Sequence, residues 1–80
     1  MQKPVAKHII KSAFRAGTYL EQILPFAKEH CDGDEYQRLL KSVAIAIHGI
    51  QDQIVEQVLL VHPDLRQEID DSIAAYGVFI

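Results

Sequence analysis

The run Val43-Ala44-Ile45-Ala46-Ile47-His48-Gly49-Ile50 carries apolar or small side chains almost all the way round a helix. It lies inside a longer segment, residues 35–61, whose apolar residues recur at helical spacing. A surface helix needs an apolar stripe on one side only, so this run predicts neighbours on several sides. A chain of 80 residues supplies few such neighbours, and association is a common remedy at this size. We therefore expect a second copy of the chain to complete the core.

The composition predicts one folded domain over residues 1–80. Hydrophobic residues make up 49% and charged residues 24% of the chain, which is typical of globular proteins. The single cysteine, Cys31, excludes an internal disulfide and fits a reducing compartment. No apolar run approaches the roughly 18 residues that a membrane-spanning helix needs, and residues 1–11 do not resemble a secretory signal. We expect a cytoplasmic protein with no membrane partner.

The first expected helix covers about residues 4–30. Pro4 suits the first turn, where its missing N–H would have no partner. Pro25 predicts a kink or a break, because it cannot donate to the carbonyl of Glu21. The residues within one helical arc are Ala6, Ile9, Ile10, Ala13, Ala16, Gly17, Leu20, Leu24 and Ala27.

The second expected helix covers about residues 35–61 and folds back on the first as an antiparallel hairpin. We expect Gly33 to end the first helix in a left-handed conformation, and Asp32 or Asp34 to open a capping box. Counting outward from this turn places Gly17 level with residues 46–50. The main apolar face comprises Tyr36, Leu39, Val43, Ala46, Ile47, Ile50, Ile54 and Val61.

The third expected helix covers about residues 63–76. His62 and Pro63 mark its boundary, because the residue before a proline disfavours helix, and Gly77 is the expected stop. Its buried stripe comprises Leu65, Ile69, Ile73 and Tyr76. The apolar tail 78–80 should dock on the bundle or on a partner. The fold class is therefore all-α: an antiparallel helical hairpin plus a shorter third helix, completing a helical bundle as a homodimer.

Charge is unevenly distributed along the chain. Residues 1–31 carry a net charge of +3 and residues 42–80 a net charge of −5. Four basic residues at four-residue spacing form one slanting stripe, and they are Lys3, Lys7, Lys11 and Arg15. The stripe could bind nucleic-acid phosphates or, less favoured, anionic lipid headgroups. Alternatively, it is a solvated face, or it faces the acidic third helix within the chain or across a dimer.

Two groups of polar residues are candidates for a metal or catalytic site. His48, Asp52 and Glu56 recur at four-residue steps, but no Glu in the chain has a His three residues later, as helical di-metal sites require. The cluster 30–35 is explained by a helix end and capping aspartates, apart from Cys31, which has no partner for nucleophilic catalysis. No phosphate loop or nucleophile elbow is present. We expect no catalytic residue, cofactor or metal, and no enzyme.

Apolar residues outside the main helical faces remain to be explained. Placed on a regular helix, Ile45, Val55 and Leu59 lie roughly opposite the main face of residues 35–61. The residues predicted to bind a partner are Phe14, Tyr19, Ile45, His48, Val55 and Leu59. The predicted function is a non-enzymatic protein–protein interaction module, such as a small adaptor, regulator or inhibitor, that binds itself and another protein. The alternative is a nucleic-acid-binding regulator that uses the basic stripe.

Overall fold

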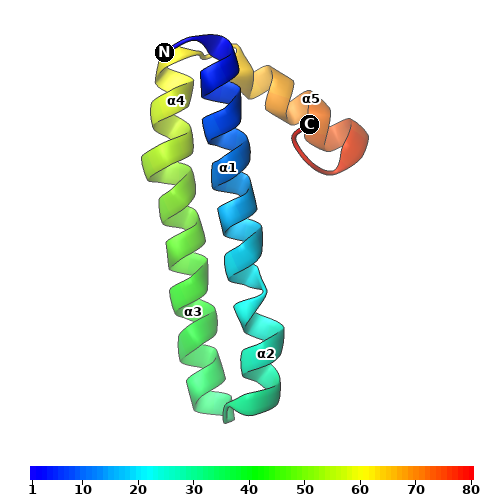
Figure 1. Cartoon of the computed structure of the whole chain (residues 1–80). Coiled ribbons are helices and arrows are strands. Elements are labelled where there is room, and N and C mark those ends of the chain that lie inside the picture. The colour runs from blue at the N-terminus through cyan, green and yellow to red at the C-terminus, as the bar shows by residue number, and fades with distance from the viewer.

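The computed structural model describes residues 1–80 and contains helices but no strand. The elements in chain order are α1 (Lys3–Glu21), α2 (Ile23–His30), α3 (Gly33–Ile50), a π-helical segment (Gln51–Val55), α4 (Glu56–Val61) and α5 (Leu65–Tyr76). α1 and α2 form one arm of a hairpin, α3 and α4 form the other, and α5 leaves the open end at an angle (Figure 1). The expected all-α class and the hairpin with a third helix are confirmed.

The first arm is broken, as Pro25 predicts, but the break lies three residues earlier. α1 ends at Glu21, and the backbone N–H of Gln22 donates to the carbonyl of Tyr19 at 3.2 Å, a tighter turn than that of an α-helix. Because Pro25 has no N–H, the Glu21 carbonyl has no partner four residues later. The helix therefore breaks at this carbonyl, and α2 begins again at Ile23.

The turn at the closed end of the hairpin is held by a capping box. Oδ1 of Asp32 accepts from the backbone N–H of Glu35 at 2.8 Å, and Oε1 of Glu35 accepts from the backbone N–H of Asp32 at 3.1 Å. Asp32, rather than Asp34, is thus the N-cap. The prediction that Gly33 ends the first helix in a left-handed conformation is wrong, because Gly33 is the first residue of α3. The extended backbone of Cys31 reverses the chain instead.

The π-helical segment changes which residues of α4 face the core. A π-helical turn holds one extra residue, so it rotates everything that follows by about one residue step relative to a regular helix. Val55 and Leu59 are consequently buried, with 1% and 5% of their surfaces exposed, whereas Ile54 and Val61 are exposed. The expectations that Val55 and Leu59 face outward and that Ile54 and Val61 form the core are both wrong. They assumed a regular α-helix through residues 51–55.

The hydrophobic core lies at the open end of the hairpin, where three helices meet. It comprises Ala6, Ile10, Ala13, Val55, Val58, Leu59, Leu65 and Ile69. Toward the closed end the hairpin is two helices thick, and the buried residues there are Gly17, Ala27 and Val43. A Cβ built on Gly17 would lie 3.8 Å from Cγ2 of Ile47, which confirms that Gly17 is level with residues 46–50.

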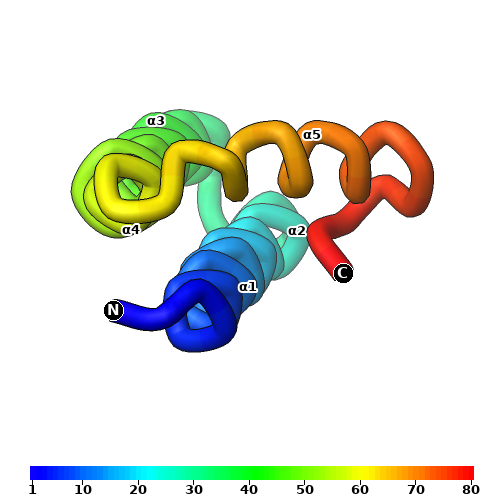
Figure 2. The backbone as a smooth tube through the Cα atoms, turned by 90° about the horizontal axis from the view of Figure 1, so that it is seen from above, coloured from blue at the N-terminus to red at the C-terminus, as the bar shows by residue number.

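Only the first half of α5 packs on the hairpin. Leu65 and Ile69 are buried, whereas Ile73 and Tyr76, the other members of the predicted stripe, are exposed. Figure 2 shows the reason, because α5 runs away from the hairpin as it proceeds. The apolar stripe of α5 is continuous in the sequence, but the hairpin lies beside only its first half.

The chain turns back after α5 and returns its C-terminus toward α1. Gly77 ends the helix with a φ of 77°, which confirms the expected stop, since this left-handed conformation favours glycine. The Ser72 hydroxyl donates to the carbonyl of Val78 at 2.9 Å and accepts from the N–H of Ile80 at 2.8 Å. The ring of Phe79 packs edge-on against Phe14, with centroids 6.4 Å apart. The expected docking of the tail is confirmed for Phe79.

Candidate functional site

The six residues predicted to bind a partner do not form one surface. Val55 and Leu59 belong to the core, so neither can contact a partner without unfolding of the open end. Phe14 is half-buried and faces Phe79 of the tail. These three side chains stabilise the fold of the single chain.

The other three predicted residues are exposed. Tyr19 on α1 and Ile45 on α3 have 75% and 64% of their surfaces exposed, which is high for large apolar side chains. His48 lies on α3 with its Nε2 3.0 Å from Oδ2 of Asp52. This pair is a surface contact one helical turn in length, as expected from the spacing.

Half of the basic stripe is paired with α5. The Nζ atom of Lys3 lies 2.6 Å from Oδ2 of Asp64 and 2.8 Å from Oε2 of Glu68, and Nζ of Lys7 lies 3.0 Å from Oε1 of Glu68. Oε2 of Glu68 is shielded from solvent, and the ammonium group of Lys3 at 2.8 Å compensates its charge. The opposite charges of the two ends of the chain therefore meet within one molecule.

These contacts shift three pKa values. The hydrogen bond from Lys3 lowers the pKa of Asp64, and hydrogen bonds from Lys3 and then Lys7 lower the pKa of Glu68. The same hydrogen bonds, that to Asp64 first, raise the pKa of Lys3. All three groups thus remain charged over a wider pH range than they would in the unfolded chain.

The rest of the stripe has a different environment. Nζ of Lys11 lies 5.4 Å from the centroid of the Phe79 ring, within the range of a cation–π contact. Arg15 is exposed and has no carboxylate partner within ion-pair distance. Arg15 is therefore the one member of the stripe that has neither an intramolecular ion pair nor a cation–π contact.

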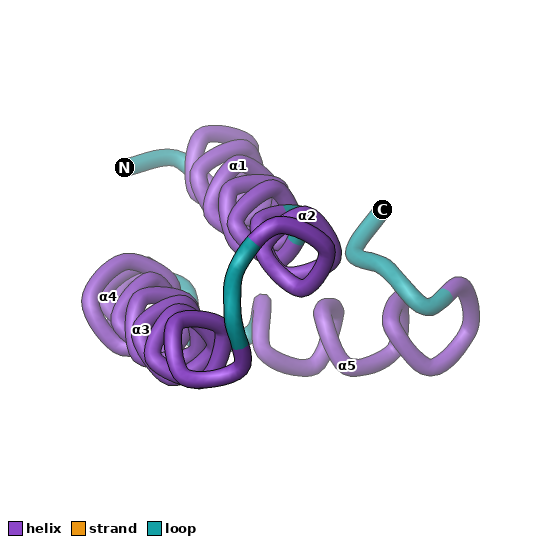
Figure 3. The backbone as a smooth tube through the Cα atoms, turned by 90° about the horizontal axis from the view of Figure 1, so that it is seen from below, coloured by secondary structure: helices purple, strands orange, loops and turns teal.

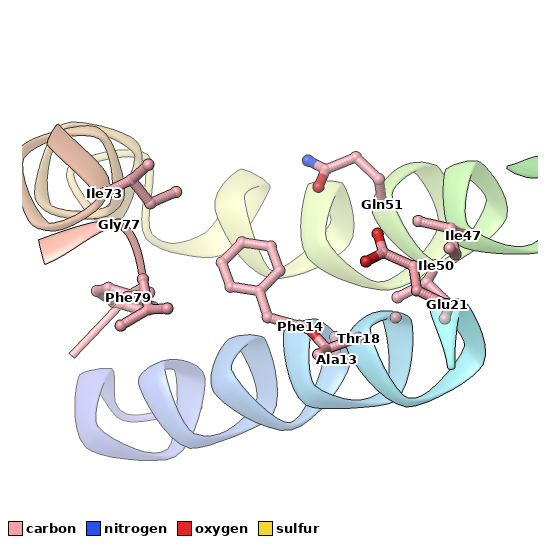
Figure 4. Close-up of a pocket in the computed structure, with 12 residues that line it drawn as sticks. Ala13, Phe14, Thr18, Glu21, Ile47, Ile50, Gln51, Ile73, Gly77 and Phe79 are labelled. Atoms are coloured by element: carbon pink, nitrogen blue, oxygen red, sulfur yellow. The ribbon is translucent and has the colours of Figure 1, made fainter. Parts of the chain in front are cut away.

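The face of the hairpin on which α5 lies contains a cavity of about 270 Å³ (Figure 4). It opens between α1, α3 and the tail, and Phe14, Ile73 and Phe79 line one end of it. Glu21 is the single ionisable residue of its lining. Its volume is slightly below the roughly 300 Å³ at the lower end of typical ligand pockets.

The same face continues as a shallower groove toward the closed end. This groove has a volume of about 690 Å³ and lies between α2 and α3. Glu21, Ile47 and Gln51 line both the cavity and the groove, so the two are continuous. Leu24 and Leu40 supply apolar lining to the groove. The cavity and the groove together form one long channel between the hairpin helices.

The opposite face of the hairpin is not covered by any element. Seen from either end, α5 lies to one side of the hairpin, and on the other side no helix covers it (Figures 2 and 3). Only the N-terminal residues reach over that side, at the open end, where the Met1 carbonyl oxygen lies 2.9 Å from Nε2 of His62. We call this second side the uncharged face. Its large apolar residues are Val5, Ile9 and Leu20 on α1, and Leu39, Ile54 and Val61 on the other arm.

The sequence signal for the uncharged face is that five of its six large apolar residues lie in the apolar arcs that predict the hairpin core; Val5 lies outside those arcs. Val5 and Ile9 each precede a lysine of the basic stripe by two residues, about 200° round the helix, so they lie on the side away from α5. The signal is an apolar arc too wide for one neighbouring helix. A single sequence does not show which edge of such an arc stays open.

No group of three or more His, Cys, Asp or Glu side chains is arranged to hold a metal ion. None of the helices has the length and apolar character to cross a bilayer. Comparisons with protein-family models, with curated proteins and with solved structures found no match to this chain. The geometry of its own surface is therefore the basis for a functional proposal.

Proposed function

We propose that this protein is a non-enzymatic interaction module that binds other protein chains through exposed apolar helical surface, and that it forms a homodimer. In this role it acts as a small adaptor, regulator or inhibitor. A cytoplasmic location is part of the proposal, because the single Cys31 is a free thiol and free thiols persist in reducing compartments.

The observation that carries the proposal is how little of the apolar surface the single chain buries. Eleven of 80 residues are buried, and fourteen large hydrophobic side chains are exposed. The radius of gyration is 15.0 Å, whereas a compact chain of this length has about 12 Å. Exposed apolar surface on this scale marks an interaction site in a soluble protein.

Tyr19, Ile45 and His48 support contact with a second kind of protein. Each is exposed, and an aromatic and an aliphatic anchor are the residue types that dominate binding energy at interfaces. His48 also lines the groove between α2 and α3, so a partner seated in that groove would touch it.

Affinity capture with the tagged chain from extracts of its native host tests this proposal. We expect one or a few proteins to be retained by the native chain and lost with Ile45→Asp. Ala75→Asp places the same charge on exposed α5 and is the matched control. Equal retention by the native chain and both variants would count against a role for Ile45. A chain that retains nothing and is monomeric would refute the function.

Nucleic-acid binding is the second candidate, and the ion pairs weigh against it. Lys3 and Lys7 would have to leave Asp64 and Glu68 before contacting phosphates. Lys11 and Arg15, which have no carboxylate partner, supply too little charge for the steep salt dependence typical of such binding. We expect no retention of a fluorescent duplex by the native chain at low salt. Binding that falls with salt and is lost in Lys7→Glu with Arg15→Glu would favour this candidate instead.

A further inference from the structure

The uncharged face consists of two antiparallel helical arms without a third layer. Its large apolar residues, named above, span the hairpin from Val5 and Val61 at the open end to Leu20 and Leu39 toward the closed end. Positions between them on the same side are small and polar or apolar, such as Ser12 and Ala16 on α1. Val5, Ile54 and Val61 each expose more than two-fifths of their surface.

The absence of charged side chains from this face contrasts with the face that carries α5. There, Lys3, Lys7 and Lys11 lie on α1, and Glu21 lies further along the same helix. On the uncharged face, no Lys, Arg, Asp or Glu lies between Val5 and Leu20 on the same side of α1. Depletion of charge is the compositional mark of an interface core.

The accessible surface of the chain is larger than its mass predicts. It measures 5759 Å², whereas a folded monomer of 9.0 kDa is expected to expose about 4,850 Å². The excess of about 900 Å² is close to the roughly 800 Å² that each partner buries in a standard interface.

The dimensions of the uncharged face agree with that area. Leu39 and Val61 are separated along their arm by about 33 Å at 1.5 Å per residue. Two helices packed side by side are about 20 Å wide, so the face covers about 660 Å² in projection before side-chain relief is added. The face alone therefore provides most of the area that a stable dimer needs.

We propose that the occupant of the uncharged face is the same face of a second copy of this chain. This inference rests on the proposed function and names its self-association surface. Under two-fold symmetry each residue near the axis meets its own equivalent, so a charged face would bring like charges together and an uncharged one does not. Two antiparallel hairpins packed in this way form a four-helix bundle, with α5 of each copy on the outside.

Sedimentation equilibrium of the native chain is the first measurement. We expect a mass twice the 9.0 kDa of the chain at micromolar concentration. The decisive comparison is between Val61→Lys and Leu60→Lys, which introduce the same charge at adjacent exposed positions of α4. Val61 lies on the uncharged face, whereas Leu60 points about 100° away from it.

Val61→Lys should weaken dimerisation by about tenfold or more, because it places two like charges in an apolar interface. Leu60→Lys should leave the dissociation constant unchanged. Val5→Lys, at the other edge of the face, should repeat the effect and serves as the readout if Val61→Lys loses its helical circular dichroism.

Three results would overturn the inference. These are a native chain that is monomeric at about 100 µM, a dimer that both Val61→Lys and Val5→Lys leave intact, and equal weakening by Leu60→Lys and Val61→Lys. A monomer that still captures another protein through Ile45 would remove this inference and the proposed homodimer, and it would keep the proposed role as an interaction module. A monomer that captures nothing would remove both.

Discussion

The ammonium group of Lys3 lies 2.6 Å from the carboxylate of Asp64, joining the first turn of α1 to the start of α5 across 61 positions of sequence. With Glu68 also in contact with Lys3, this pair holds the third helix against the open end of the hairpin. The first half of α5 is thus fixed on the hairpin, where Leu65 and Ile69 are buried, whereas Ile73 further along is exposed.

The pH dependence of stability should reflect these groups. The pKa values of Asp64 and Glu68 are lowered in the folded chain, so their contribution is present above their ordinary values of 3.8 and 4.5 and is lost as the pH falls through the lowered values. The raised pKa of Lys3 has the opposite sign: its contribution is present below 10.5 and is lost as the pH rises through the raised value.

Thermal unfolding of the native chain and of Asp64→Asn with Glu68→Gln checks this sign. The native chain should have the higher midpoint near pH 7, and the difference should shrink as the pH falls below 3.8 and 4.5 and through the lowered pKa values of Asp64 and Glu68. The three side chains are partly exposed, so we expect a small difference. A difference that does not depend on pH would contradict the assignment.

Gly17 should tolerate a methyl group. Its added Cβ would lie at an ordinary contact distance of 3.8 Å from Ile47, and Gly within a helix costs about 0.5–1 kcal/mol relative to Ala. Gly17→Ala should therefore raise the free energy of unfolding by about that amount in urea titrations. Gly49→Ala, with open space around it, is the control for helix propensity alone. Loss of stability in Gly17→Ala only would mean that the arms are closer than described.

Asp32 should contribute more to stability than Asp34. Asp32→Ala removes the hydrogen bond to the N–H of Glu35 and should cost about 1 kcal/mol in urea unfolding. Asp34→Ala leaves the capping box intact and should cost less, through its interaction with the helix dipole alone. Equal losses would show that the capping box does not hold the turn.

The π-helical segment makes a prediction about deletions. Because the segment holds one extra residue, deletion of exposed Gln53 should convert residues 51–55 to regular α-helix and keep Val55 and Leu59 in the core. The Gln53 deletion should therefore stay folded by circular dichroism. Deletion of Asp52 and Gln53 together rotates α4 by a further 100° or so and should unfold the open end, since each displaced apolar side chain is worth about 1.5–3 kcal/mol. If the Gln53 deletion were less stable than the deletion of Asp52 and Gln53 together, the π-helical segment would not hold one extra residue as described.

Much of the helical fold follows from local chemistry. Pro25 removes a donor, Asp32 and Glu35 cap a helix, and Gly77 accepts a left-handed backbone; each effect acts within a few residues. The prediction of the partner-binding residues is wrong for Val55 and Leu59, which lie in the core. The sequence predicts that Val55 and Leu59 face outward, and the structure buries both. The angular position of each residue round a helix accumulates over all the residue steps before it, and the extra residue of the π-helical segment changes that angle.

The apolar periodicity and the breaks specified how many helices form and that two of them make a hairpin, because backbone hydrogen bonding and side-chain spacing are properties of neighbours in the chain. The rotation of α4, the pairing of Lys3 and Lys7 with α5, and the choice of which hairpin face stays open were settled by packing between distant segments. In each of these cases several local patterns are compatible with the sequence. The arrangement that buries Val55, Leu59 and Leu65 together, while neutralising Glu68, is the one that the folded chain adopts.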